Sequence, residues 1–425
     1  MAGEWREHSL GELCSLITDG KHGDCRNEAG SGYYFLSVKD VFGDRMVYDN
    51  ARQIMEADFA ETHRRTNLEP GDVLFTNTGT IGRMAIAPDD PKTARTTFQK
   101  SVAILKPKRE IVLSRFLYFA LRFDNARLSD FAAGTTQKNL LLRDLRAFTV
   151  LIPPLAEQKA IAAVLGALDD KIELNRRMNA TLEAMARALF QSWFVDFDPV
   201  RAKLDGRKPI GLDETTAALF PAHFDHKSEG VIPTGWRATT LGEVIEIFDS
   251  KRIPLSGRER EARQGKFPYH GAASVMDYVD DFLFDGIYAL MGEDGSVINE
   301  DGTPVLQYVW GKFWVNNHAH VLCGKKGIST EHLLLHLKGS NIAPFVNGAV
   351  QPKLNQGNMN RIPFMLPPPE IGQAFAKTIE PFFAQIRATT EESRTLATLR
   401  DTLLPKLLSG ELSVADTTLT TGANL

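Results

Sequence analysis

The chain has 425 residues, 43% of them hydrophobic and 24% charged, which is enough to bury more than one core. No apolar run approaches the roughly 18–20 residues that a membrane-spanning helix needs, and the first residues lack the apolar stretch of a signal peptide, so we expect a cytoplasmic location. The formal net charge of −4 excludes a surface that attracts nucleic acid as a whole, although it allows a local basic groove.

The cysteines exclude two further classes of protein. Cys14, Cys25 and Cys323 are odd in number and widely spaced, so they form neither a disulfide framework nor a metal-binding CxxC pair. We expect them to be ordinary packing residues.

Residues 1–152 are predicted to form the first globular module. Short β-prone segments alternate there with glycine-bearing turns, which is typical of a strand-rich fold. The expected strands are 33–38, 72–76, 102–107 and 148–153, and segment 115–123 is expected to be helical.

Residues 153–197 are predicted to form one long helix. Pro153 and Pro154 hold the preceding chain extended and suit a helix start. Apolar residues then recur at alternating steps of four and three, which is the pattern of a coiled-coil seam with a polar centre. The seam positions are Ile161, Leu165, Leu168, Ile172, Asn175, Asn179, Leu182 and Leu189.

A second module and a second helix follow. Residues 198–235, rich in Pro, Gly and Asp, are predicted to be a linker, and residues 236–366 a second strand-rich module. Residues 367–411 repeat the long helix, and 412–425 form a C-terminal tail. The seam positions of this helix are Phe375, Ile379, Phe382, Ile386, Leu396 and Leu403.

The two halves are internal repeats. Residues 181–197 align without gaps on 395–411, an offset of 214 that also relates Pro153 to Pro367 and Gln137 to Gln351. Near the module starts, Trp5 recurs as Trp236, an offset of 231.

The repeat predicts an α+β protein: two mixed α/β modules separated by two long helices that pack as an antiparallel coiled coil, with an internal pseudo-twofold repeat. In the seam, Thr389 and Ser393 would face Asn175 and Asn179 and set the register. We expect Pro405 to kink or end the second helix. The alternative is two unrelated surface helices on separate cores, which the shared register disfavours.

These helix sequences carry a family resemblance. Residues 152–200, beginning IPPLAEQKAIAAVLGALDDKIELNRR, resemble the central repeat of the specificity subunits of type I restriction-modification systems, and TLRDTLLPKLLSGEL (398–412) resembles their distal repeat. The segments 134–145 and 348–359 fit the same family. The second copy departs from the family's sequence motif at Ile371 to Gln373. We therefore expect the two repeats to offer non-equivalent surfaces for the docking of other subunits.

The resemblance implies a non-catalytic protein whose two target recognition domains each read one half of a split sequence in double-stranded DNA. The helices would act as a ruler and as the docking surface for two methyltransferase subunits, with restriction subunits joining in the full complex. It implies no cofactor on this chain: S-adenosylmethionine, ATP and Mg²⁺ would be bound by partner subunits.

Polar, glycine-bearing segments of both modules supply candidate DNA contacts. Phosphates are bound by Lys, Arg and backbone amides, whereas bases are read by Arg, Lys, Asn or Gln at groove depth. The candidates are Lys21, Arg83, Gln99, Lys100, Lys251, Arg252, Arg258 and His270. For each of these residues, the alternative is that it lies in an ordinary solvent-exposed turn and does not contact DNA.

Two rival functions remain open at this point. His318 and His320 form HxH, and His332 and His336 lie four apart, a spacing that can hold zinc, although the glutamate of HExxH is missing. A metal-dependent enzyme is therefore one alternative, and a protein-binding scaffold is another. Methylation by this chain itself is disfavoured, because the sequence has neither an NPPY-like tetrapeptide nor an FxGxG loop.

Overall fold

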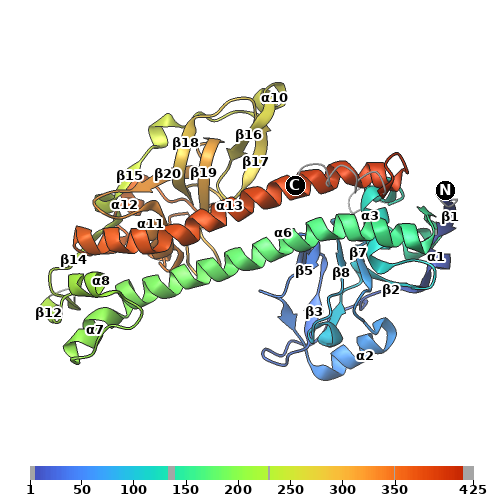
Figure 1. Cartoon of the computed structure of the whole chain (residues 1–425), viewed down its shortest axis with the longest axis horizontal. Coiled ribbons are helices and arrows are strands. Elements are labelled where there is room, and N and C mark those ends of the chain that lie inside the picture. Colours follow the sequence, from blue (N-terminus) through green and yellow to red (C-terminus); the bar gives the residue numbers. More distant parts are fainter. Residues whose placement is uncertain (1–4, 133–138, 228–229, 349, 415–425) are drawn as a thin grey trace. The chain divides into compact units, whose positions relative to one another are not determined.

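The computed structural model describes residues 5–132, 139–227, 230–348 and 350–414. It divides into two compact units: Met1–Glu173 with Ser393–Leu425 form unit 1, and Leu174–Glu392 form unit 2. Each unit contains one mixed α/β module and one half of each long helix (Figure 1). Gln137 and most of the predicted tail lie outside the described residues.

Unit 1 is built on a four-stranded antiparallel sheet in the order β2-β10-β7-β8. Smaller sheets have the orders β6-β3-β9, β4-β5 and β1-β11. The strands are β1 Arg6–Ser9, β2 Cys14–Asp19, β3 Tyr34–Leu36, β4 Val41–Phe42, β5 Arg45–Met46, β6 Arg52–Gln53, β7 Val73–Thr76, β8 Met84–Ile86, β9 Thr96–Phe98, β10 Val102–Pro107 and β11 Thr149–Ile152. The helices of the module are α1 Leu10–Leu13, α2 Glu56–Thr66, α3 Ser114–Phe123, α4 Asn125–Asp130 and α5 Leu142–Ala147.

Strand β10 shows why this sheet is the centre of unit 1. Its residues Val102 to Leu105 are all fully buried, which fits a strand covered on both faces. Ala103 and Leu105 belong to the core under helix α3, whereas Val102 and Ile104 belong to a separate core on the opposite face. The alternation of side chains along the strand thus supplies both cores.

Unit 2 is built on a six-stranded sheet in the order β15-β20-β18-β19-β16-β17, in which only the β16-β19 pair is parallel. A separate pair joins β14 and β21. The strands are β14 Arg237–Thr240, β15 Ile245–Ile247, β16 Gln264–His270, β17 Val275–Val279, β18 Phe284–Gly292, β19 Leu306–Val315, β20 Ala319–Gly324 and β21 Pro363–Leu366. The helices are α9 Leu241–Val244, α10 Gly257–Ala262, α11 Thr330–Lys338 and α12 Gln356–Asn360.

The segment predicted as a linker, 198–235, has a folded structure of its own. It contains helices α7 Asp198–Leu204 and α8 Glu214–Leu219 and the strand pair β12 Phe224–Lys227 with β13 Gly230–Pro233. Val200 and Phe220 are buried in the same aromatic core as Trp193 and Trp236. The segment therefore packs on unit 2 by burying its own apolar side chains.

The repeat seen in the sequence is also a repeat of elements. Each module opens with a strand and a one-turn helix, and it closes with a strand that pairs with the opening one: β1 with β11, and β14 with β21. Leu10 N–H donates to the Phe148 carbonyl at 2.9 Å, and the repeat-related Leu241 N–H donates to the Ile362 carbonyl at 2.7 Å. The same hydrogen bond thus closes both modules.

The long helices are α6 Leu155–Phe190 and α13 Pro369–Leu408. Helix α6 continues into a π-helical turn, Gln191–Val195. Contrary to our expectation, α13 does not end at Pro405 but continues to Leu408. The proline is tolerated because it lies in the last turn of the helix. A proline there removes a single hydrogen bond, the one to the Asp401 carbonyl, and Asp401 is exposed to water.

Within each unit the two helices pair in opposite directions. In unit 1 the start of α6 meets the end of α13: Ile161 and Leu165 share a core with Leu404 and Leu407. In unit 2 the end of α6 meets the start of α13: the rings of Phe190 and Phe375 lie 6.2 Å apart. This is the antiparallel pairing that the sequence predicts.

The predicted seam positions are all buried or half-buried. The buried ones are Ile161, Leu165, Asn175, Phe375, Ile379 and Ile386, and the half-buried ones are Leu168, Ile172, Asn179, Leu182, Leu189, Phe382, Leu396 and Leu403. At one step Phe383, rather than Phe382, takes the fully buried place. A 3.6-residue helix drifts by about 20° per heptad against a strict 3.5-residue pattern, so such one-residue shifts are expected.

Candidate DNA and subunit interface

Three candidate DNA contacts of unit 1 lie together beside the end of β2. Lys21 N–H donates to the Phe98 carbonyl at 2.7 Å, Lys21 pairs with Gln99 in a parallel bridge, and Lys100 N–H donates to the Lys21 carbonyl at 3.1 Å. Lys100 is exposed, whereas the Lys21 ammonium binds Glu61 at 2.8 Å. This hydrogen bond raises the pKa of Lys21, so its charge is retained.

Arg83 lies at a second place in unit 1. Its Nη1 donates to the Val38 carbonyl at 3.2 Å, and its guanidinium lies over the ring of Phe42, 5.4 Å from the centroid. The next residue after Val38 is the exposed Lys39, which the sequence analysis missed. A single lysine in a polar stretch carries no signal by itself, and only the fold brings it near Arg83.

Lys251 and Arg258 are exposed in unit 2. The Lys251 ammonium lies 5.0 Å from the centroid of the Phe248 ring. Arg258 belongs to α10, whose start is capped by Ser256, which accepts a hydrogen bond from Glu259 N–H at 3.3 Å. Both cations are therefore held on ordered backbone at the surface.

Arg252, by contrast, points into unit 2. Its Nη1 donates to Glu293 Oε2 and to the Ala319 carbonyl, both at 2.6 Å, and its Nη2 lies 3.4 Å from Asp249 Oδ2. Only 11% of its side chain is exposed. Pulling it out would leave two carboxylates without their counterion, so we correct its predicted role from DNA contact to structural ion pair.

His270 is also inside the module. Its Nδ1 lies 2.9 Å from Gln307 Oε1. Because Gln307 Nε2 donates to the Gly271 carbonyl at 2.8 Å, its Oε1 is the acceptor, and the His270 proton is on Nδ1. This buried hydrogen bond ties β16 to β19, so a direct DNA contact by His270 is not supported by its position.

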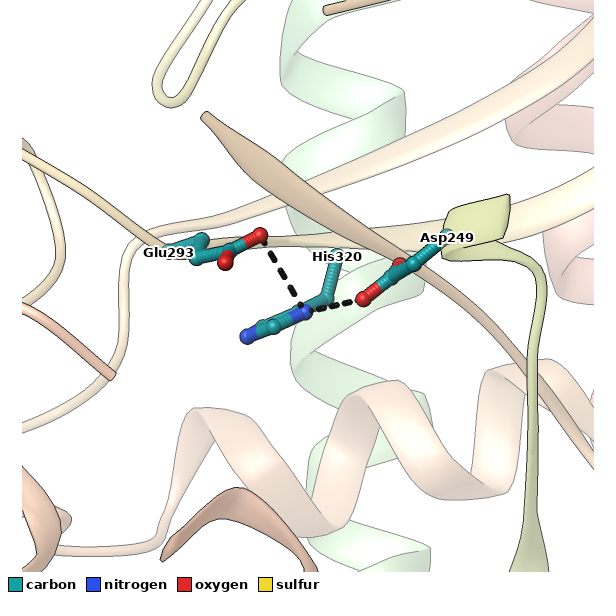
Figure 2. Close-up of side chains that lie close together, drawn as sticks. All are labelled: Asp249, Glu293 and His320. Carbon is teal, nitrogen blue, oxygen red and sulfur yellow. Dashed lines mark hydrogen bonds and ion pairs between the residues drawn. The ribbon is translucent and has the colours of Figure 1, made fainter. Parts of the chain in front are cut away.

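A group of possible metal ligands lies beside Arg252 in unit 2. His320 Nδ1 is 2.6 Å from Asp249 Oδ2 and 3.6 Å from Glu293 Oε2 (Figure 2). His320 Nε2 is 2.8 Å from the Leu354 carbonyl. Both ring nitrogens thus face oxygen atoms: Nδ1 faces the two carboxylates, and Nε2 faces the Leu354 carbonyl.

Hydrogen bonds hold the Asp249 carboxylate of this group in its ionised form. Burial raises the pKa of Asp249, but hydrogen bonds from His320, from Val321 N–H and from Gln356 outweigh burial and hold the pKa below its usual value. The Asp249 carboxylate is therefore ionised, and Nη2 of Arg252 lies 3.4 Å from it. The residues fit a closed polar network.

The four histidines of the rival metal hypothesis do not form one site. Among the described residues, His320 is the one member that belongs to a group of three possible ligands. His318 is exposed. His332 and His336 belong to α11, where His332 packs against the ring of Phe194 and His336 against the ring of Phe364. Burial lowers the pKa of His332 to about 3 and that of His336 to about 4.

The long helices also present apolar side chains outward. Leu155, Leu174 and Met185 of α6 and Leu399 of α13 are exposed in their respective units. Single exposed apolar residues are normal on a protein surface, so these four do not mark an interface by themselves. All four lie outside the seam positions of the two helices.

No helix in the described ranges combines the length and the apolar character that crossing a membrane requires.

Known proteins resemble this chain over almost its whole length. The chain is 27% identical over 408 residues to the type I restriction enzyme MjaIX specificity subunit of Methanocaldococcus jannaschii, covering 91% of this chain and 88% of that protein. It is 24% identical to the type I restriction enzyme HindI specificity subunit of Haemophilus influenzae, covering 96% and 100%. The crystal structure of a type I restriction-modification S subunit from M. genitalium has the same fold, with a TM-score of 0.51 at 17% identity over 95% of this chain and 96% of that one.

A family model agrees with the repeat of modules and helices. The model described as the type I restriction modification DNA specificity domain matches residues 2–184 and again residues 233–397. Each match spans one module and most of the helix that follows it. The chain therefore belongs to the type I restriction modification DNA specificity family and carries two copies of its domain.

Proposed function

We propose that this chain is the DNA sequence-recognition subunit of a type I restriction-modification complex, in which each module reads one half of a bipartite target. It is a specificity component and not itself the catalyst. The observation that carries the proposal is the duplication. Two copies of a DNA specificity domain are present, and each is followed by one helix of an antiparallel helix pair.

The helix pair explains how two modules can read one duplex. Two readers on the same face of B-DNA must be separated by about 34–36 Å, one helical turn, or by a multiple of it. A packed helix pair keeps its length, whereas a flexible linker of the same reach would let the distance between the two half-sites vary. We therefore assign the helices the role of a ruler.

Six polar side chains are the proposed DNA contacts; Lys100, Lys251 and Arg258 are exposed, and Lys21, Arg83 and Gln99 are half-buried. In unit 1 they are Lys21, Arg83, Gln99 and Lys100, and in unit 2 they are Lys251 and Arg258. The lysines suit phosphates, and Arg83, Arg258 and Gln99 have the planar donor groups that read base edges.

The proposed partners follow from the same family. Both relatives are named as specificity subunits of a restriction enzyme, which implies further subunits. We propose that two methyltransferase subunits dock on the helices and that restriction subunits join through them. S-adenosylmethionine, ATP and Mg²⁺ then belong to those partners, and the assembly works in the cytoplasm.

Methylome sequencing tests the function. In a host carrying this gene and its methyltransferase partner, deleting the gene should abolish methylation at one bipartite motif, and restoring the gene should return it. The control is deletion of the methyltransferase gene, which should remove the same motif. An unchanged methylome in the first strain would contradict the proposal and would favour the scaffold alternative.

A further inference from the structure

Each unit has a hollow where the end of a long helix meets the closing strand of the module. The hollow of unit 1 has a volume of about 260 Å³, and that of unit 2 about 400 Å³. Residues bordering the first include Ala120, Phe123, Leu151 and Leu408. Residues bordering the second include Phe194, His336, Gly339 and Met365.

The two hollows occupy equivalent places in the repeat. Leu151 and Met365 differ by the offset of 214 that relates the long helices, and so do Phe194 and Leu408. Helices α3 and α11 begin at residues 114 and 330, an offset of 216 that relates Phe123 to Gly339. The same corner of helix, strand and helix end is thus open in both units, although the side chains around it differ.

The size of the hollows suits a side chain better than a cofactor. Ligand pockets span about 300–1,000 Å³, so one hollow falls below this range and the other lies near its lower end. Apolar side chains form part of the wall of each hollow: Phe194, Leu335 and Phe364 border the second, and Val150 and Leu408 border the first. Small apolar hollows are the places where single anchor residues of protein partners bind most tightly.

The hollow of unit 2 also has a polar group in need of a partner. His332 borders it and is only 1% exposed, and its Nδ1 has no hydrogen-bond partner among the described residues. The equivalent residue in unit 1 is Phe116, which has no such group. A buried nitrogen without a partner is costly, so a polar atom beside an apolar anchor would be stabilised here by a hydrogen bond to Nδ1.

The charge at the two mouths differs. No acidic residue borders the unit 2 hollow in the described structure, where Lys338 is paired with Glu183 at 2.8 Å and Arg187 makes no ion pair with a described residue. Glu7 and Asp124 border the unit 1 hollow together with Arg127, which donates to the Thr149 carbonyl. An acidic partner segment is therefore attracted more strongly to unit 2.

We propose that the two hollows are anchor sites for the same apolar side chain on two copies of the methyltransferase subunit, one copy per unit. This inference rests on the proposed function. Two identical partners present identical residues, and the repeat presents two equivalent hollows for them. An acidic group beside this anchor would bind more strongly at unit 2, where Arg187 and Lys338 border the hollow.

Matched tryptophan substitutions test the proposal. Leu151→Trp and Met365→Trp narrow the first and the second hollow at equivalent strand positions. Leu16→Trp and Met276→Trp, at exposed strand positions away from the hollows, serve as controls. Each complex is purified with its methyltransferase subunit, native mass spectrometry counts the bound copies, and titration gives their dissociation constants.

Each hollow variant should weaken the binding of one methyltransferase copy at least tenfold and leave the binding of the other copy unchanged. The double variant should bind neither copy. Gly339→Phe is a second way to narrow the unit 2 hollow, because its backbone φ of −102° is ordinary and a Cβ there would meet no atom closer than 3.8 Å.

Two outcomes separate this inference from the proposed function. If both copies bind the hollow variants as tightly as the controls, the anchor sites are wrong, while the recognition function stands. If the unmodified chain binds no methyltransferase subunit at all, the proposed function itself fails, and the anchor inference fails with it.

Discussion

Equivalent residues of the two repeats have acquired different chemistry. Phe116 and His332 hold the same position in α3 and α11, and both are buried. Phe116 packs edge-on against Trp5, with ring centroids 6.4 Å apart, and His332 packs against Phe194 at 4.3 Å. An imidazole thus stands in an aromatic core where the other repeat has a phenyl ring.

His332→Phe should make the protein less sensitive to acid. The pKa of His332 is lowered by burial to about 3, below its usual value of 6.5, so the unfolded chain binds the proton more readily and stability falls as the pH drops from about 6.5 towards 3. One pKa unit corresponds to about 1.4 kcal/mol, so His332 should account for roughly 2–3 kcal/mol of lost stability between pH 6.5 and 4.5. Urea unfolding at several pH values measures this loss.

The exposed His318 is the control for this experiment. His318→Ala also removes one imidazole, and it should lose more stability on acidification than His332→Phe does. A His332→Phe variant that loses as much stability on acidification as the unchanged protein would contradict the assignment of the effect to this buried imidazole.

At the scale of elements, polar side chains set how α6 and α13 pair in unit 2. Asn175 Nδ2 donates to Glu392 Oε2 at 2.7 Å, Thr389 Oγ1 donates to Asn179 Oδ1 at 2.5 Å, and Asn179 Nδ2 donates to Thr390 Oγ1 at 3.2 Å. Thr389 is the repeat equivalent of Asn175. These groups are satisfied only when the helices keep this register, since a shift would bury them without partners.

Thr389→Val should destabilise this helix pair. The valine has nearly the same shape but leaves Asn179 without the hydroxyl, which should cost about 1–3 kcal/mol of unfolding free energy. Combined with Asn179→Ala in a double-mutant cycle, the pair should show a coupling of about 0.5–3 kcal/mol by urea unfolding.

The exposed Thr378 of α13 offers the same substitution as a control. Thr378→Val should change the unfolding free energy by no more than about 0.5 kcal/mol. A coupling near zero between residues 179 and 389 would show that the polar contacts do not hold the register.

At the scale of the whole molecule, each module is closed by its own strand pair. In the first module β1 pairs with β11 from Arg6 opposite Ile152 to Ser9 opposite Thr149. In the second, β14 pairs with β21 from Arg237 opposite Leu366. Cuts after residue 152 and on either side of 236–366 therefore leave each pair inside its own module.

Replacing residues 1–152 with the matching module of a relative should change one half of the methylated motif and leave the other half and the spacer intact. The reason is that the helices, which we propose set the spacer, are unchanged. Methylome sequencing of the exchanged strain measures the motif. The reciprocal control replaces residues 236–366 and should change only the other half; a change of both halves after one exchange would contradict independent reading.

The sequence predicted well where the signal was periodic or repeated. The two modules and the paired helices followed from the offset of 214 residues and the seam from Ile161 onward, because local periodicity dictates which face of a helix is buried. Pro405 and Phe382 were predicted less well, since a helix end tolerates proline and a seven-residue pattern drifts on a straight helix.

The candidate site was only partly predictable from the sequence. Lys21, Gln99 and Lys100 were chosen separately, and strand pairing brings them together. Arg252 and His270 were chosen because of their residue types, but their partners Glu293 and Gln307 lie about 40 residues away in the chain. No local pattern says whether a cation faces DNA or a buried carboxylate.

The sequence by itself determined the duplicated plan of this protein, because composition, periodicity and repetition are properties of neighbouring residues along the chain. The tertiary structure alone decided which polar residues are buried, which hydrogen bonds hold the helix register in unit 2, and where the two equivalent hollows lie. Those features depend on contacts between residues far apart in the chain, and such contacts exist only once the cores have packed.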